Sequence, residues 1–173
     1  YMVGMSLLRA FEANSTAFTD GQLTIPESGN GIPDFLDEAL YSLKAWEQLQ
    51  EDDGGVRTGA ESYRHPYGFN FADLDPLPYW TYAKDAIHTA RVAGLFAQAA
   101  RLVAPYSQTK ADELRGRAIK AYDYAVANGV SETTDGPMFW AASELYRLTA
   151  DAKYKLKFDA TWVANDVGGR GPS

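Results

Sequence analysis

The sequence predicts an all-α protein. Three observations support this fold class: about six segments carry apolar residues at helical spacing, no stretch of any length alternates like a strand, and glycine or proline separates the segments. With 173 residues, 46% of them hydrophobic, the chain is long enough for one domain with a substantial core. We expect a single domain over residues 1–173, with the glycine-rich residues 168–173 as a flexible tail.

The helix around which the chain is organised is expected from Pro33 to Gln50. Glycine-rich residues 28–31 form a turn before it, and Pro33 suits a first helical turn, where its missing N–H needs no partner. A turn through Asp52 and Asp53, followed by two glycines, is expected to end the helix. Its apolar residues share one helical face: Ile32, Phe35, Leu36, Ala39, Leu40, Leu43, Trp46 and Leu49.

The remaining elements follow from the same spacing. Helices are expected over residues 1–14, 85–103, 109–128, 137–149 and 152–165. The helix over 85–103 is rich in alanine, and such small side chains let neighbouring helices approach closely. Residues 16–27 are expected to be a loop with a short extended piece at 22–25.

The long irregular stretch over residues 52–81 combines glycine and proline with many aromatic residues. A loop of this length is usually functional or disordered, and its aromatic content argues against disorder. We therefore expect an ordered loop that forms a surface or one side of a cleft.

Composition excludes several classes of function. The net charge of −7 and a pI near 4.8 argue against a nucleic-acid partner. No apolar run has the length of a membrane span, so no membrane partner is expected. The absence of cysteine excludes disulfides and thiolate metal sites. No signal peptide is visible, and the chain is expected to begin inside a larger domain.

Four segments, in this order, resemble the central part of glycoside hydrolase family 9, the inverting cellulases. They are residues 28–39 (SGNGIPDFLDEA), 53–56 (DGGV), 93–106 (AGLFAQAARLVAPY) and 139–149 (FWAASELYRLT). The resemblance implies a partial (α/α)6 barrel with about six of its twelve helices. It also implies that the parent enzyme hydrolyses β-1,4-linked glucans with inversion, and that the parent is secreted or periplasmic.

The same resemblance implies that the catalytic residues lie elsewhere. In the family, the base comes from a D-A-G-D motif upstream of the first matched segment, and the acid glutamate comes from downstream of the last. Neither stretch occurs in these 173 residues. We therefore expect no catalytic residue in this chain, and no activity from the chain alone.

Substrate-binding residues are expected just after Val56, because the matching region of the family borders the substrate cleft. The sequence here departs from the family's usual V-Y-H-K-V-T form, which leaves the sugar open. Sugars are bound by aromatic faces and by polar groups that reach their hydroxyls. The candidates of this type are Glu61, Arg64, His65 and Trp80. The alternative is that His65 only fixes the loop and that Trp80 anchors the core.

Other polar residues are interpreted as structural. Asp34, Asp37 and Glu38 are expected to stabilise the first turn of their helix through its dipole. Glu144 is expected to be a buried or half-buried partner of an arginine such as Arg147, and His88 a satisfied structural histidine.

No metal and no cofactor are expected. Many family members bind calcium through an S-G-x-x-D-E pattern before the F-W-A-A segment. The matching stretch here, residues 133–138, has glycine and proline in place of the acidic pair. Its one carboxylate, Asp135, is expected to cap the helix that follows.

Two other functions remain open at this point: a non-catalytic carbohydrate-binding helical module, and a structural fragment that associates with itself. The expected partners are a β-glucan or related oligosaccharide, together with the remaining part of the barrel or a second copy of the chain. Composition does not distinguish these alternatives.

Overall fold

The computed structural model describes residues 1–64, 68, 71, 74–130, 136–156 and 159. Most of the described chain is helical, which confirms the predicted all-α class. The elements in order are α1 (Met2–Ala13), the 3-10 helix η1 (Ser15–Ala17), α2 (Asp34–Tyr41), α3 (Lys44–Leu49), β1 (Ala60–Ser62), β2 (Tyr79–Thr81), α4 (Ala86–Val103), α5 (Gln108–Ala127) and α6 (Gly136–Thr149).

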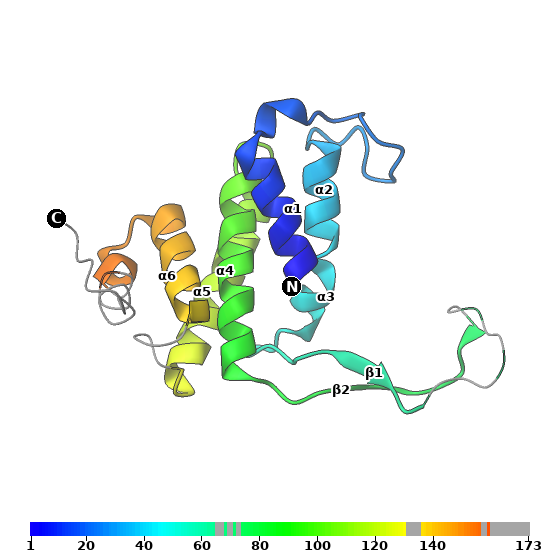
Figure 1. Ribbon diagram of the computed structural model, residues 1–173, viewed down its shortest axis with the longest axis vertical. Coiled ribbons are helices and arrows are strands. Elements are labelled where there is room, and N and C mark those ends of the chain that lie inside the picture. The colour runs from blue at the N-terminus through cyan, green and yellow to red at the C-terminus, as the bar shows by residue number, and fades with distance from the viewer. Residues whose placement is uncertain (65–67, 69–70, 72–73, 131–135, 157–158, 160–173) are drawn as a thin grey trace, which may run out of the picture.

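Helix α4 is the centre of the helical body. Figure 1 shows it between α1 and α2 on one side and α6 on the other, with α5 behind. Thirteen of its eighteen residues are buried, many of them alanine. Gly94 shows why small residues are needed: a methyl group there would lie 2.8 Å from the ring of Trp140 on α6. The predicted role of the alanine-rich helix is confirmed.

The single helix predicted over residues 33–50 is wrong, because the structure divides it into α2 and α3. The division falls at Ser42, whose hydroxyl donates a 2.6 Å hydrogen bond to the carbonyl of Ala39. The N–H of Leu43 bonds the carbonyl of Leu40, three residues back rather than four. Such serine-to-carbonyl bonds compete with the helical pattern and bend helices.

The acidic start of α2 has a larger role than the dipole interaction. Asp34 is fully buried, and its carboxylate accepts the N–H groups of Gly21 and Leu23. Asp20 accepts those of Gly29 and Gly31 at 2.6 and 2.7 Å. These bonds order the loop before α2, in which residues 22–25 form no strand.

Asp37 lies one turn further along α2. It is nearly buried and accepts one hydrogen bond, from the side-chain amide of Asn30 at 3.3 Å. Burial raises the pKa of Asp37, because water no longer solvates its charged form.

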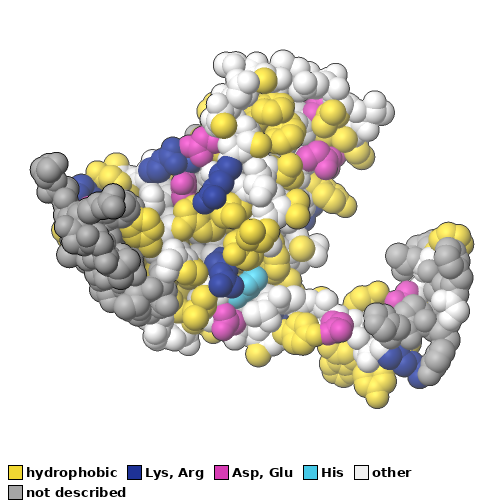
Figure 2. Space-filling view, viewed as in Figure 1, with side chains coloured by type: hydrophobic (Ala, Val, Ile, Leu, Met, Phe, Trp, Pro, Cys, Tyr) yellow, Lys and Arg dark blue, Asp and Glu magenta, His cyan; other side chains and the backbone are white. Residues whose placement is uncertain are grey.

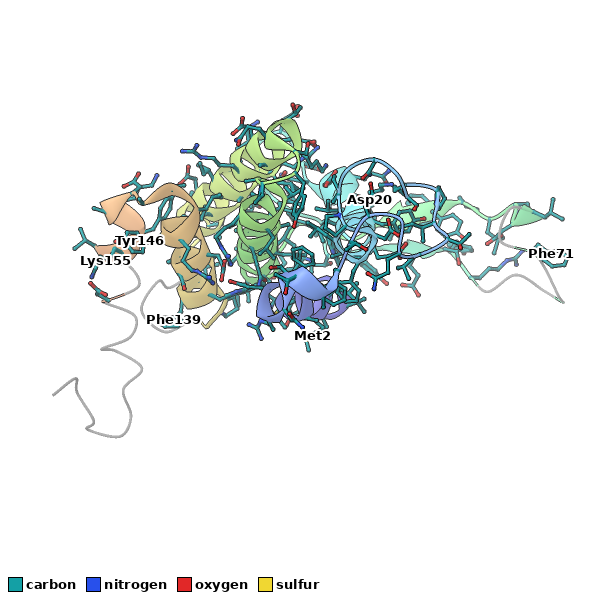
Figure 3. The ribbon with its side chains drawn as sticks, turned by 90° about the horizontal axis from the view of Figure 1, so that it is seen from above. Met2, Asp20, Phe71, Phe139, Tyr146 and Lys155 are labelled. Atoms are coloured by element: carbon teal, nitrogen blue, oxygen red, sulfur yellow. The ribbon has the colours of Figure 1, made fainter. Side chains whose placement is uncertain are left out.

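The expectation that the chain contains no strands is also wrong. β1 and β2 pair antiparallel, with Glu61 opposite Trp80. Bonds from Tyr82 to Gly59 and from Tyr63 to Pro78 continue the same register, which ends at the bridge between Arg57 and Lys84. We call residues 57–84 the arm. It projects away from the helical body in Figure 1, and Figure 3 shows Phe71 at its far end.

A polar network joins α1, α4 and α6. The predicted pair of Glu144 and Arg147 is confirmed at 3.1 Å, and Glu144 is buried. Arg101 of α4 also bonds Glu144 at 2.9 Å and Glu12 of α1 at 2.9 Å. Burial alone would raise the pKa of Glu12, but hydrogen bonds from Arg101, Gln98 and Arg147 lower it to about 2.

Some predictions fall outside the described residues. Residues 152–156 are helical, as predicted, but most of the expected remainder of that helix and the tail over 168–173 lie outside the described part of the chain. The same holds for Asp135 and its predicted capping role. In the described part of the chain, no helix combines the length and apolarity that crossing a bilayer requires.

Candidate functional site

The arm is attached to the helical body through a tightly packed turn. Gly54 has φ +91°, and a methyl group on it would overlap the backbone carbonyl of Lys120 on α5. The adjacent Gly55 lies against the ring of Tyr124. The predicted turn after α3 is therefore confirmed, and its two glycines are required because α5 leaves no room for side chains.

Ion pairs connect the two strands at the base of the arm. Glu51 bonds Arg57 at 2.6 Å and Lys84 at 2.8 Å, and Lys84 also bonds Asp53 at 2.6 Å. Hydrogen bonds from Lys84 and Arg57 lower the pKa of Glu51, and those from Lys84 and the Gly55 N–H lower the pKa of Asp53. These side chains are partly exposed, so each pair contributes little alone. Together they fix where the arm leaves and rejoins the body.

One face of the arm carries exposed aromatic side chains. In an antiparallel ladder, residues opposite one another point to the same face and alternate along each strand. This register places Tyr63, Trp80 and Tyr82 on one face, where they are 73%, 63% and 50% exposed. The ring of Tyr82 lies over Gly59, 3.8 Å from the position of a methyl group there. Figure 2 shows hydrophobic side chains gathered along the arm.

The structure brings two of the four predicted binding residues together. Glu61 lies directly opposite Trp80, and both are exposed. The exposure of Trp80 rules out the alternative that it anchors the core. Arg64 follows β1 and is exposed, and its carbonyl accepts a 2.9 Å hydrogen bond from Ser62. His65 lies outside the described residues.

His88 is not the satisfied histidine that the sequence suggested. Its ring lies 4.9 Å from that of Trp46, but its buried Nε2 has no hydrogen-bond partner among the described residues. Burial lowers the pKa of His88, and the charge of the N-terminus and of Arg91 lowers it further.

Sequence reasoning missed Tyr63 and Tyr82 as site residues. The signal was present in the order Trp80, Thr81, Tyr82, where two aromatic residues are separated by one position, as on one face of a strand. It was overlooked because the region was interpreted as a loop without strands.

The chemistry that this site supports is binding. Aromatic faces contact sugar rings, and the neighbouring carboxylate of Glu61 can accept hydrogen bonds from hydroxyls. The oxygens of Asp20 and Asp34, in the helical body, are occupied by backbone N–H groups. Among the described residues, no group of three or more His, Cys, Asp or Glu side chains is placed to hold a metal ion.

Helices packed around an alanine-rich central helix are consistent with a partial (α/α)6 barrel, the fold of the solved structures that this chain resembles. A metagenome-derived glycoside hydrolase family 9 endoglucanase superposes with a TM-score of 0.84 and 31% sequence identity. The match covers 92% of this chain and 32% of that one. The family 9 endoglucanase J30 superposes with a TM-score of 0.78 at 25% identity, over 92% of this chain and 33% of that one.

Curated relatives agree with these structures. The chain is 28% identical over 168 residues to a cellulose 1,4-beta-cellobiosidase of Acetivibrio thermocellus, and 29% identical over 164 residues to endoglucanase C of Cellulomonas fimi. Each match covers 83% of this chain but only 19% and 15% of the relatives' lengths. No family model matches the chain. By sequence and fold together, the chain resembles a part of the glycoside hydrolase family 9 cellulases that spans about a third or less of their length.

Proposed function

We propose that the chain forms the central part of a catalytic domain that hydrolyses β-1,4-linked glucans with inversion. The observation that carries the proposal is the agreement in fold and sequence with a family 9 endoglucanase over 92% of the chain. An inverting enzyme needs an acid and a base about 6.5–9.5 Å apart. In this proposal both come from the D-A-G-D and glutamate motifs that these 173 residues do not contain. The chain alone is then inactive.

The arm holds the sugar chain in this proposal. The aromatic face with Tyr63, Trp80 and Tyr82 provides apolar surfaces for sugar rings, and its exposure means that no protein group among the described residues has to be displaced. Glu61 accepts hydrogen bonds from hydroxyls beside Trp80, and Arg64 donates them at the end of β1.

The experiment measures binding and hydrolysis separately. Cellotetraose is titrated calorimetrically into the 173-residue chain, and release of reducing ends from carboxymethylcellulose is followed in parallel. Trp80→Ala should weaken binding about tenfold, which corresponds to about 1.4 kcal/mol. Tyr41→Ala is the matched control, because Tyr41 is an equally exposed aromatic residue on α2. Unchanged binding by Trp80→Ala, or hydrolysis by the 173-residue chain, would contradict the proposal.

Exposed apolar residues on the helical body favour a second candidate, in which the chain associates through its helices. Met2 and Val3 on α1 and Leu156 are each more than half exposed. Such side chains suit burial against the remaining helices of a barrel or against a second copy. Light scattering coupled to gel filtration tests this: a mass that rises with concentration above 19.0 kDa supports association, and a constant 19.0 kDa opposes it.

A further inference from the structure

A pocket with positively charged walls lies on the helical body, at the starts of α1 and α6. Its volume is about 290 Å³, and it is lined by residues from three helices: Tyr1, Met5 and Arg9 at α1, Arg91 on α4, and Pro137 and Trp140 on α6. None of these residues belongs to the arm. The pocket is therefore separate from the site described above.

The two arginines of the pocket have no carboxylate partner among the described residues. Each instead faces an aromatic ring: the Cζ atom of Arg9 is 5.8 Å from the ring centroid of Trp140, and that of Arg91 is 5.4 Å from the centroid of Tyr1. By contrast, Arg57, Arg101, Arg117 and Arg147 each bond a carboxylate. A guanidinium that packs its face on a ring keeps its N–H edge available for an acceptor.

The helix dipoles add to the positive character of this pocket. Met5 and Pro137 lie in the first turns of α1 and α6, at the positive ends of the two helix dipoles. Neither residue offers a free backbone donor, because the N–H of Met5 bonds the carbonyl of Tyr1 and proline has no N–H. The chain as a whole carries a net charge of −7. A pocket with two arginines that have no acidic partner among the described residues is therefore a positively charged place on an acidic protein.

Trp140 gives the pocket a fixed flat wall. Its ring is seated against Gly94 of α4, where any side chain would collide with it. Indole rings held in this way provide the apolar surface against which a sugar ring packs.

We propose that this pocket binds a sugar that carries a carboxylate, such as a hexuronate. A guanidinium fork matches the planar carboxylate in two parallel hydrogen bonds, and Trp140 contacts the sugar ring. The charge of the pocket selects the carboxylate. The choice of a sugar rests on the function proposed above, in which the domain acts on a polysaccharide.

The test compares glucuronate with glucose, which is its neutral counterpart. Both are titrated into the 173-residue chain at low salt, and the dissociation constants are obtained by NMR. Glucuronate should bind at least about tenfold more tightly than glucose, as expected for one charge-assisted contact. Arg9→Gln and Arg91→Gln should each remove most of this preference. Arg115→Gln on α5 is the control and should leave it unchanged.

Three outcomes would overturn the inference. Glucuronate could bind no better than glucose, acetate could bind as tightly as glucuronate, or both arginine variants could bind like the parent chain while melting at its temperature. The proposed function is tested independently, by the titration of cellotetraose described above. If cellotetraose binds through the arm and glucuronate shows no preference, this inference fails and the proposed function stands.

Discussion

The polar network at Glu12 leads to a prediction about stability. Glu12 receives hydrogen bonds from Gln98 and Arg101 of α4 and from Arg147 of α6, so one carboxylate joins three helices. The substitution Glu12→Gln keeps the size of the side chain but removes its charge. Arg101 and Arg147 retain Glu144 as a partner, so neither guanidinium is left without a carboxylate.

The size of the effect follows from the pKa of Glu12. A carboxyl whose pKa falls from 4.5 to about 2 on folding can stabilise the fold by at most about 3 kcal/mol. The side chain is 26% exposed, so solvent and salt reduce this contribution. We expect Glu12→Gln to lower the free energy of unfolding by about 2 kcal/mol at pH 7.

The pH dependence separates charge from packing. Because the folded pKa of Glu12 is the lower one, its contribution is complete above pH 4.5 and disappears as the pH falls towards 2. Urea unfolding at pH 7, 4 and 3 should therefore show the difference between the two proteins shrinking, to below about 1 kcal/mol at pH 3.

Glu113→Gln provides the control for this experiment. Glu113 pairs with Arg117 and Lys110 near the surface, and its loss should cost no more than about 0.5 kcal/mol at pH 7. A difference for Glu12→Gln that stays constant between pH 7 and pH 3, or that equals the control, would refute the reasoning.

Three further predictions concern packing and the arm. Gly54→Ala should lower the free energy of unfolding by at least about 2 kcal/mol, because Gly54 has a positive φ and contacts α5. Gly116→Ala, in an open part of α5, should raise the free energy of unfolding by about 0.5–1 kcal/mol in the same urea titration. Leu95→Ala, at a fully buried site on α4, should cost about 3 kcal/mol by thermal unfolding, and a loss below about 1 kcal/mol would argue against this core. Lys84→Met should speed proteolysis within the arm, because it removes the ion pairs with Glu51 and Asp53 at the base of the arm. The melting temperature of the body should change little, because the methionine can still contact the ring of Tyr124, over which the Lys84 ammonium lies; equal cleavage rates would contradict the role given to these pairs.

The sequence predicts best those elements whose boundaries are set locally. α4 begins where Asp85 accepts the N–H of His88, and α5 begins where Ser107 accepts the N–H of Lys110. Both helices were predicted to within a residue or two. The division between α2 and α3 was not predicted. Local sequence allows either a continuous helix or a break at the bond from Ser42 to Ala39, and tertiary packing decides between them. Gly4 of α1, packed against Ser42, is part of that selection.

The candidate sites depend on contacts that are distant in sequence. Nothing local to Glu61 indicates that Trp80 lies opposite it, so the two were proposed individually and their pairing came from the structure. The exposure of Trp80 depends on whether the arm projects or folds back onto the helices. The pocket with Arg9 and Arg91 requires α1, α4 and α6 to meet, which helical periodicity alone does not reveal.

The bridge between Arg57 and Lys84 also makes the arm a replaceable part. Because these two residues face each other across the ladder, a short hairpin turn could join them directly, and the helices would keep their connection. The described residues in between contribute Glu61, Trp80 and the exposed tyrosines, and none of them belongs to the buried hydrophobic core. A chain shortened in this way would keep the helical body and lose the residues proposed to bind the sugar. Arms from related proteins could then be grafted at the same two positions.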